Sequence, residues 1–383
     1  MKKGFDWWEE VVADCQEVIR IPSLSGQEKE LADFLEGRMK ELDYDEVRRD
    51  EVGNVIGKVE GDEKLSTVGF SAHMDHVSPG DESKWEFPPY SGARSGGYIH
   101  GRGASDTKGA IATQLHLPRL LDEAKTEHGD VYVVFVVLEE VGGFGSEQLD
   151  KSDLDYLILG EPTANELRIG HRGRIELELK VKGKSAHASV PEKAENPHFP
   201  MAKFMSKFAA LEMKSAAGRN SSAAPTLFST DQESPNVIPS ECSLIIDWRT
   251  IPGETETEVT GRVEKILPSG GELRVVENEI ETYTGTTFRQ KGVRQPYYIE
   301  SDHRAVEEAE KAVKKVLERE VDVSWWDFAT DAGFFDDAGI PVIGFSPCEE
   351  GYAHTSEDRV SLALMKESLK CYPEIAGRLS VIK

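Results

Sequence analysis

A buried strand that ends in two acidic residues constrains the fold of this chain most strongly. Residues 131–138, VYVVFVVL, are apolar and almost all β-branched or aromatic, and Glu139, Glu140 and a nearby Gly-Gly follow. Such a run is typical of a strand buried on both faces in the core of a parallel sheet. Adjacent carboxylates beside a low-dielectric core repel each other. The stretch therefore predicts a parallel sheet and, at the end of this strand, a positive group or a reaction that needs a base.

Two domains are expected, because 383 residues are too many for one ordinary core. Residues 1–173 and 281–383 alternate helical and strand signals, which predicts an α/β domain with a mixed, mainly parallel sheet. Between them, residues 174–280 contain IELELKVKG, whose alternation of apolar and charged residues indicates a sheet with one solvent-exposed face. We therefore expect an inserted small α+β domain, ferredoxin-like, that serves as a lid and dimerisation domain.

Local signals predict three helices in the first part of the chain. They cover residues 6–20, 27–42 and 106–121. Ser25 and Glu28 have the spacing of a capping box at the start of the second helix. Asp106 stands at the start of the third helix, where an aspartate is ordinarily the N-cap.

Charge and composition exclude several classes of partner. The formal net charge of −25 argues against nucleic acids and anionic membranes, which need clustered basic residues. No apolar stretch approaches the roughly 18–20 residues that span a bilayer, and the N-terminus does not resemble a secretory signal. The four cysteines are far apart and form no CxxC pair, so the cytoplasm is the expected compartment.

Histidines and acids follow the ends of four predicted strands. In an open parallel sheet, ligands bind outside the carboxyl ends of the strands, where residues from different strands meet. A further aspartate lies in the glycine-rich stretch GRGASDTKGA, whose backbone permits close approach. The residues concerned are His73 and Asp75, Asp106, Glu139 and Glu140, Glu161, and His354.

Each of these residues alone has an ordinary explanation, such as an N-cap, a turn residue or a core histidine. Together they are harder to explain, because each buried and uncompensated charge costs several kcal/mol. Two divalent ions about 3.5–4 Å apart with a bridging carboxylate would resolve this cost. Imidazole and carboxylate ligands suit zinc best, with cobalt or manganese as substitutes.

Five motifs in this order resemble the M20 metallopeptidase/amidohydrolase family. They are HMDHV, GRGASDTKGA, LEEVGG, GEPT and AHTSED, and KGKSAHAS and DWRTIP in the inserted segment also fit. The resemblance runs nearly end to end. The family includes acetylornithine deacetylase, succinyl-diaminopimelate desuccinylase, aminoacylase and glutamate carboxypeptidase relatives.

The resemblance implies a site with two zinc ions per subunit. His73 and Glu161 would bind one ion, Glu140 and His354 would bind the other, and Asp106 would bridge them. Glu139 would be the general base. Asp75 would fix the tautomer of His73.

The resemblance also implies roles for residues of the inserted segment. His187 matches a histidine that reaches the active site of the neighbouring subunit and stabilises the oxyanion, so the enzyme would be a homodimer formed through its lid domains. Arg249 and Asn236 are similar to residues that contact the substrate carboxylate. The ordinary alternatives are an exposed loop histidine and an Arg249–Asp247 ion pair.

One departure bears on the substrate. His171 and Arg172 lie where some relatives carry two arginines for the acyl or carboxylate end of the substrate. The missing arginine argues against a succinylated substrate, because its second negative charge would need a fixed cation.

The predicted function is hydrolysis of the amide bond in a small N-acyl amino acid, as in acetylornithine deacetylase. Alternatives within the family are a dipeptidase, carboxypeptidase or aminopeptidase acting on small peptides, and an N-succinyl-diaminopimelate desuccinylase. A non-catalytic binding protein is disfavoured, because it has no need for Glu139 beside a complete ligand set. A phosphatase or nuclease is disfavoured, because no basic residues cluster near these motifs.

Overall fold

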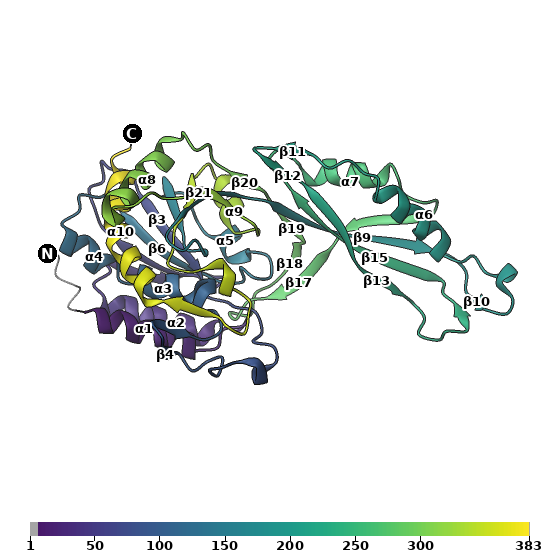
Figure 1. Cartoon of the computed structure of the whole chain (residues 1–383), viewed down its shortest axis with the longest axis horizontal. Coiled ribbons are helices and arrows are strands. Elements are labelled where there is room, and N and C mark those ends of the chain that lie inside the picture. Colours follow the sequence, from purple (N-terminus) through teal and green to yellow (C-terminus); the bar gives the residue numbers. More distant parts are fainter. Residues whose placement is uncertain (1–6, 383) are drawn as a thin grey trace.

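The computed structural model describes residues 7–382 and contains two separate hydrophobic cores. The larger core is built from both ends of the chain, and the smaller one lies in the middle of the sequence and extends away from it (Figure 1). The first predicted helix is α1 (Trp8–Arg20), and its predicted start at Asp6 lies outside the described residues.

The larger core surrounds a nine-stranded mixed sheet in the order β1-β2-β6-β3-β7-β22-β8-β20, with β21 beside β8. The four central strands β6, β3, β7 and β22 are parallel, whereas β1, β2 and β20 pair antiparallel at the flanks. The predicted mixed α/β sheet is thus present, with its parallel part at the centre. The strands are β1 (Glu46–Arg49), β2 (Val55–Val59), β3 (Val68–His73), β6 (Val131–Val136), β7 (Tyr156–Leu159), β8 (Leu167–His171), β20 (Tyr297–Tyr298), β21 (Val323–Trp326) and β22 (Val342–Gly344).

Amphipathic helices pack on this sheet. Helix α10 contacts α3, α4 and α8, and α1 contacts α3. No helix in the described part of the chain is both long and apolar enough to cross a membrane. The helices are α2 (Lys29–Glu41), α3 (Gly109–Gln114), α4 (Leu117–Ala124), α5 (Phe144–Gln148), α8 (Arg304–Leu317), α9 (Ala332–Asp336) and α10 (Leu362–Ser380), and a small sheet combines β4 (Ala93–Ser95), β5 (Tyr98–His100) and β23 (Arg359–Ser361).

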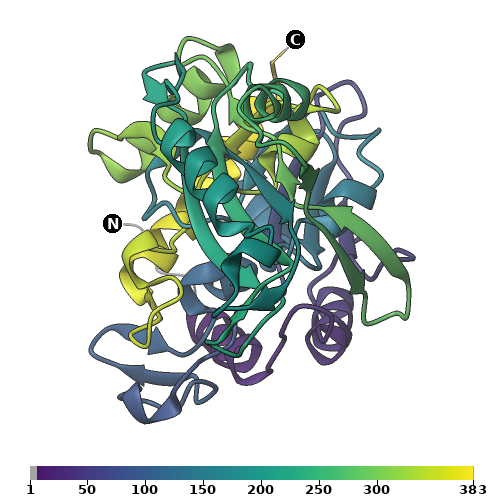
Figure 2. The same ribbon diagram turned by 90° about the vertical axis from the view of Figure 1, so that its right-hand side faces the viewer.

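The smaller core lies between an antiparallel sheet and two helices. The sheet order is β13-β15-β9-β16, with β19 also beside β9. Along the sequence, the main elements alternate in the order strand, helix, strand, strand, helix, strand. Helices α6 and α7 lie side by side on one face (Figure 2), where they cover the apolar side chains of alternating strand positions. The elements are β9 (Gly173–Lys182), α6 (His198–Phe208), β13 (Ser222–Thr230), β15 (Glu241–Thr250), α7 (Glu256–Glu264), β16 (Gly271–Val275) and β19 (Val293–Arg294), with the short pairs β10 (Ala186–His187)/β14 (Val237–Ile238) and β11 (Ser215–Ala216)/β12 (Arg219–Asn220).

A hairpin connects the two parts of the molecule. Strands β17 (Glu277–Glu281) and β18 (Thr287–Lys291) extend from the smaller part toward the larger one (Figure 1). At its tip, the Tyr283 hydroxyl donates to the Gly53 carbonyl at 2.6 Å. The predicted domain boundary between residues 280 and 281 therefore falls inside this hairpin, which contacts both parts.

The predicted capping box was wrong. Helix α2 begins at Lys29 without a side-chain cap. Instead, the Ser25 hydroxyl donates to Asp75 at 2.7 Å, and the buried Glu28 carboxylate accepts from the Leu138 backbone amide at 3.2 Å. Both residues therefore support the strand ends at the site rather than the helix.

The predicted helix over residues 106–121 was wrong in its extent. It divides into α3 and α4, and Pro118 lies in the first turn of α4. Proline has no backbone N–H and is therefore suited to a helix start rather than a helix interior. Asp106 has non-helical backbone angles, φ −146° and ψ 83°, and is not an N-cap. Its carboxylate is consequently free to face the histidines of the site.

Candidate metal centre and active site

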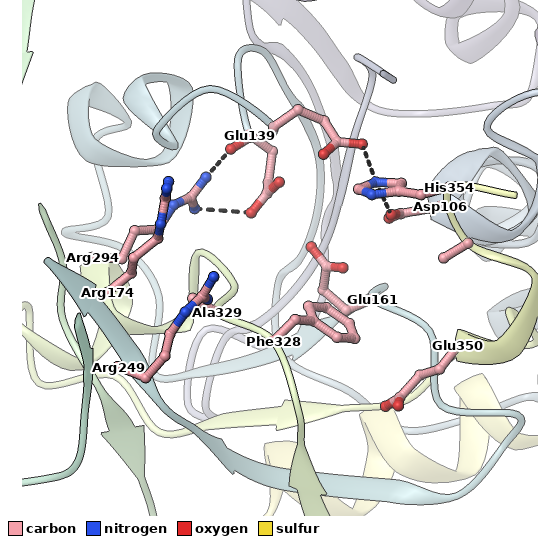
Figure 3. A pocket seen from close by; sticks show the side chains of 12 residues that line it. Asp106, Glu139, Glu161, Arg174, Arg249, Arg294, Phe328, Ala329, Glu350 and His354 are labelled. Carbon is pink, nitrogen blue, oxygen red and sulfur yellow. Dashed lines mark hydrogen bonds and ion pairs between the residues drawn. The ribbon is translucent and has the colours of Figure 1, made fainter. Parts of the chain in front are cut away.

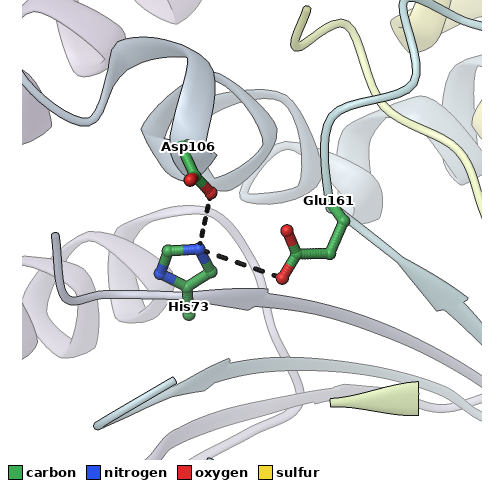
Figure 4. A group of neighbouring side chains, drawn as sticks. All are labelled: His73, Asp106 and Glu161. Carbon is green, nitrogen blue, oxygen red and sulfur yellow. Dashed lines mark hydrogen bonds and ion pairs between the residues drawn. The ribbon is translucent and has the colours of Figure 1, made fainter. Parts of the chain in front are cut away.

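The carboxyl ends of the central strands bring the predicted residues to one place. His73 is the last residue of β3, the turn with Glu139 and Glu140 follows β6, Glu161 follows β7, and the loop after β22 leads to His354. Asp106 approaches from the stretch before α3 and lies between His73 and Glu161 on one side (Figure 4) and His354 on the other (Figure 3). Parallel strands end at the same edge of a sheet, which is why residues so far apart in sequence meet.

The two carboxylate oxygens of Asp106 contact two different imidazoles. Its Oδ1 lies 2.9 Å from His73 Nε2, and its Oδ2 lies 3.0 Å from His354 Nε2. Glu161 Oε1 is 3.9 Å from His73 Nε2, and Glu140 Oε1 is 3.0 Å from His354 Nε2. The five residues thus form two groups of three potential ligands that share Asp106, with the ligand atoms of each group within 4.8 Å of one another.

The electrostatics of the two groups fit bound cations. Burial raises the pKa of Glu139 to about 8 and that of Glu161 well above its ordinary value, and repulsion by Glu139 contributes to the shift of Glu161. Burial also raises the pKa of Glu140, and the hydrogen bonds of His354 to Asp106 and Glu140 raise the pKa of His354 to about 10. These shifts express an excess of buried negative charge, which divalent cations would neutralise. One imidazole and two carboxylates at each position, with one carboxylate shared, form the mixed nitrogen and oxygen ligand set that zinc accepts.

The proton of His73 is placed by a backbone carbonyl. His73 Nδ1 lies 2.9 Å from the carbonyl oxygen of Asp75, whereas the Asp75 carboxylate is 3.5 Å away. A carbonyl oxygen only accepts, so Nδ1 carries a proton, and Nε2 is the nitrogen that faces Asp106 and would bind a cation. The expected control of the tautomer thus comes chiefly from the backbone of Asp75 rather than from its side chain.

The Asp75 carboxylate organises the turn that carries the two glutamates. Its oxygens accept hydrogen bonds from the backbone amides of Glu139 at 2.9 Å and Glu140 at 3.1 Å, and from the Ser25 hydroxyl. Asp75 is completely buried, so these bonds are not exchanged for bonds to water. It therefore positions both glutamates at the end of β6.

Glu139 has a basic partner that the sequence motifs did not indicate. Arg294 Nη1 lies 2.9 Å from Glu139 Oε1 and 2.6 Å from Asp331 Oδ1, and its Nη2 donates to the backbone carbonyl of Glu139. Arg294 is therefore the positive group that was expected at the end of β6. Arg294 lies in the short strand β19, where the chain returns from the smaller sheet, and GVRQPYY carries no recognisable motif.

Two further arginines face the candidate metal ligands across a cavity of about 400 Å³. Arg174 and Arg249 lie on β9 and β15, opposite Asp106, Glu161 and His354 (Figure 3). Arg249 also forms an ion pair with Asp247, at 2.6 Å, which is the ordinary alternative to a substrate contact. The statement that no basic residues cluster near the motifs was therefore wrong, because strands of the smaller sheet bring in arginines that are distant in sequence.

His187 and Asn236 do not join this site. His187 is exposed on β10, and its Nδ1 is 2.8 Å from the Ser189 hydroxyl. Asn236 is also exposed and lies beside it, because the Ala188 amide donates to the Asn236 carbonyl at 2.9 Å. Figure 1 places β10 at the end of the smaller part that lies farthest from the large sheet. Neither residue lines the cavity that holds the candidate metal ligands.

Comparisons with known proteins agree with this geometry. The family model described as Peptidase family M20/M25/M40 matches residues 69–378, a range that contains all five candidate ligands and Glu139. The uncharacterized protein YgeY of Escherichia coli strain K12 is 26% identical over 375 residues, which cover 94% of this chain and 92% of that protein. A succinyl-diaminopimelate desuccinylase of Pseudoalteromonas atlantica is 26% identical over 328 residues, which cover 81% and 83%.

A solved structure has the same fold over the whole chain. The YXEP protein of Bacillus subtilis, described as a dinuclear metal-binding peptidase from the M20 family, superimposes with a TM-score of 0.74 at 14% identity and covers 98% of this chain and 99% of its own. The family model spans most of the sequence, and the matched residues form the two ligand groups described above. The chain therefore belongs to peptidase family M20/M25/M40 and is a metal-dependent hydrolase of amide or peptide bonds.

Proposed function

We propose that the protein is a di-zinc hydrolase that cleaves the amide bond of a small N-acyl amino acid, with Glu139 as the general base. The observation that supports this most directly is the position of Glu139, next to two ligand groups that share Asp106 and opposite a wall of arginines (Figure 3). A cavity of about 400 Å³ suits a small ligand. Arginine suits the carboxylate that an N-acyl amino acid carries.

In this proposal His73 and Glu161 would hold one ion, Glu140 and His354 would hold the other, and Asp106 would serve both. When bound, the two ions supply Lewis acidity, which polarises the amide carbonyl and lowers the pKa of an attacking water toward about 7. Arg294 binds Glu139 Oε1, and Oε2 has no hydrogen-bond partner within residues 7–382. Glu139 Oε2 is therefore available to accept the proton of the attacking water and then to donate it to the departing amine.

A hydrolysis screen tests the proposed reaction. We expect the zinc-loaded protein to release the free amine from N-acetyl amino acids, and a chelator-treated sample to be inactive until zinc is restored, because both ligand groups lose their cations. The screen compares N-acetyl amino acids, N-succinyl-L,L-diaminopimelate and dipeptides by their kcat/KM. Hydrolysis that continues after complete metal removal would contradict the mechanism, and turnover of dipeptides alone would favour the second candidate below.

The second candidate is hydrolysis of small peptides. The cavity wall includes Glu350, whose side chain is about one-third exposed and whose pKa is raised by burial. A carboxylate at this place could bind the free α-amine of a dipeptide, which an N-acyl amino acid lacks. Arg168 is Glu350's nearest cation, at 3.7 Å, so Glu350 is only weakly paired.

We also propose that the protein is a homodimer formed through the smaller part. The edge strand β13 exposes Leu227 and Phe228, 61% and 42% of their surfaces, and α6 exposes 70% of Phe199. An unpaired strand edge with exposed apolar side chains is suited to pairing with a second copy. His187 and Asn236 belong to the same part but lie away from the site of their own chain. This supports the proposal that they act in the site of a partner subunit.

Replacing Leu227 by aspartate is expected to convert the protein to a monomer. The charge would be placed at the exposed edge strand, where a dimer contact would bury it at high cost. Sedimentation velocity would show one 42.5 kDa chain instead of two. The matched control is Val381→Asp, which adds the same charge at a residue 48% exposed near the end of α10 and should leave the dimer intact. A Leu227→Asp dimer would contradict this interface.

The cysteines support the cytoplasm as the proposed compartment. Cys15, Cys242, Cys348 and Cys371 are all buried free thiols. Proteins of oxidising compartments ordinarily use disulfides, whereas cytoplasmic proteins keep their thiols reduced.

A further inference from the structure

Three arginines lie side by side across three neighbouring strands. The antiparallel register places Arg174 of β9 directly opposite Arg249 of β15 on one side and Arg294 of β19 on the other. Residues opposite each other share a face of the sheet, and neighbouring strands are about 4.8 Å apart. All three side chains line the cavity that holds Asp106 and Glu139 (Figure 3). We call Arg174, Arg249 and Arg294 the arginine row.

Like charges directly opposite each other destabilise a sheet, so the arginine row needs counter-charges. Asp247 accepts from Arg174 Nε at 2.7 Å and from Arg249 Nε at 2.6 Å, and Glu176 accepts from Arg174 Nη2 at 2.7 Å. Neither Asp247 nor Glu176 lines the cavity. This wall therefore presents guanidinium groups toward the candidate metal ligands, with their counter-charges beside them on the sheet.

The three arginines of the row differ in exposure and in how many of their N–H groups are already hydrogen-bonded. Arg294 is 12% exposed and is bound to Glu139 and Asp331. The Arg174 and Arg249 side chains are 41% and 33% exposed, and within the described residues no acceptor is bound to Nη1 of either one. Two adjacent guanidinium groups with free donors match the two oxygens of one carboxylate.

The position of the pair along the row indicates which carboxylate it binds. In an N-acyl amino acid, the α-carboxylate is two bonds from the amide nitrogen, which receives its proton from Glu139. Arg294 is bound to Glu139 Oε1 and is therefore the arginine of the row nearest the amide nitrogen. Arg174 and Arg249 lie about one and two strand spacings farther away. A carboxylate held there belongs to a more distant part of the substrate.

We propose that the enzyme is selective for amides that carry two carboxylates, and that Arg174 determines this specificity by binding the second carboxylate together with Arg249. This inference rests on the proposed function. The second carboxylate could be on the amine side, as in N-acyl acidic amino acids, or on the acyl side, as in N-succinyl amino acids. The argument from His171 against a succinylated substrate then no longer holds, because Arg174 and Arg249 supply the fixed cations that it required.

Three substrates of similar size test the charge requirement on the zinc-loaded protein. N-acetyl-L-glutamate and N-succinyl-L-alanine carry two carboxylates, with the second on opposite sides of the amide, and N-acetyl-L-glutamine carries only one. We expect kcat/KM to be at least about tenfold higher for one of the two dicarboxylates than for N-acetyl-L-glutamine, and the preferred dicarboxylate identifies the side. Equal values for all three substrates would overturn the inference.

Arg174→Gln is expected to lower this ratio about tenfold, mainly through KM. The matched control is Arg274→Gln, which removes the same charge from β16 of the same sheet at a side chain 63% exposed and outside the cavity. The control should keep the wild-type ratio. A ratio unchanged by Arg174→Gln would show that Arg174 does not determine the specificity.

Calorimetry with reaction products separates this inference from the proposed reaction. The zinc-loaded protein should bind L-glutamate more tightly than L-glutamine, or succinate more tightly than succinamate, and Arg174→Gln should remove the difference. Charge-selective binding without hydrolysis of any amide would overturn the proposed function and support the dicarboxylate site. Amide hydrolysis without charge-selective binding would overturn the dicarboxylate site alone.

Discussion

Replacing Glu139 by glutamine is expected to lower kcat by about 10²- to 10⁴-fold, the usual contribution of a general base. Glutamine keeps the shape of the side chain and can still accept from Arg294, so the turn after β6 should stay in place. It cannot take a proton from water at neutral pH. The measurement is steady-state kinetics on the zinc-loaded variant, together with its zinc content and melting temperature.

The Glu139→Gln result depends on a matched control. Glu147→Gln makes the same chemical change at an exposed residue of α5 and should leave kcat unchanged. Two bound zinc ions with a large loss of kcat would be the signature of a base that is not a ligand. Unchanged hydrolysis in Glu139→Gln would contradict the assignment of Glu139 as the general base.

Replacing Asp106 by asparagine is expected to weaken both metal positions at once and to reduce hydrolysis to background. Asp106 offers Oδ1 to the group of His73 and Oδ2 to the group of His354. Asparagine supplies one neutral oxygen, and its NH2 group cannot bind a cation. Zinc affinity should fall by more than the roughly 10- to 100-fold that follows loss of an outer-shell partner. Equilibrium dialysis with metal analysis should find fewer than one zinc ion per chain.

Variants that change only one of the two ligand groups serve as controls for Asp106→Asn. Glu161→Gln and His354→Ala each remove a ligand from one group only and should each leave one ion bound. Asp81→Asn, on an exposed loop, should keep both ions. An Asp106→Asn protein that still binds two zinc ions would contradict a shared ligand.

His73, Glu140 and Glu161 could be predicted because they lie at the ends of buried strands or within a few residues after them. The runs before Glu139 and Glu161 are almost entirely apolar, and the run before His73 is interrupted only by Gly69 and Ser71, so the sequence predicts their place in the centre of a parallel sheet. Because parallel strands end at the same edge of a sheet, these residues are predicted to lie close together even when no long-range contact is known. The structure places these residues as this rule requires.

The supporting interactions could not be predicted, because they join segments without shared patterns. The spacing to Glu28 predicts Ser25 as a helix cap, yet its hydroxyl donates to Asp75, which lies 50 residues away in the sequence. Local spacing indicated the capping box, but the buried Asp75 carboxylate competes for the same hydroxyl. Such competition is decided by tertiary packing.

The apolar strands and the residues at their ends were sufficient to indicate the sheet and a set of histidines and carboxylates for a metal pair, and the resemblance to the M20 family implied which of them are ligands and which is the base. The arginine row was decided only by tertiary structure. Alternating strands specify which face each side chain occupies, but they do not specify which residue of another strand lies opposite. The register of β15, β9 and β19 sets three distant arginines next to each other and in front of the ligands. Charges that attract a substrate act through space, so their arrangement follows the fold rather than the order of residues.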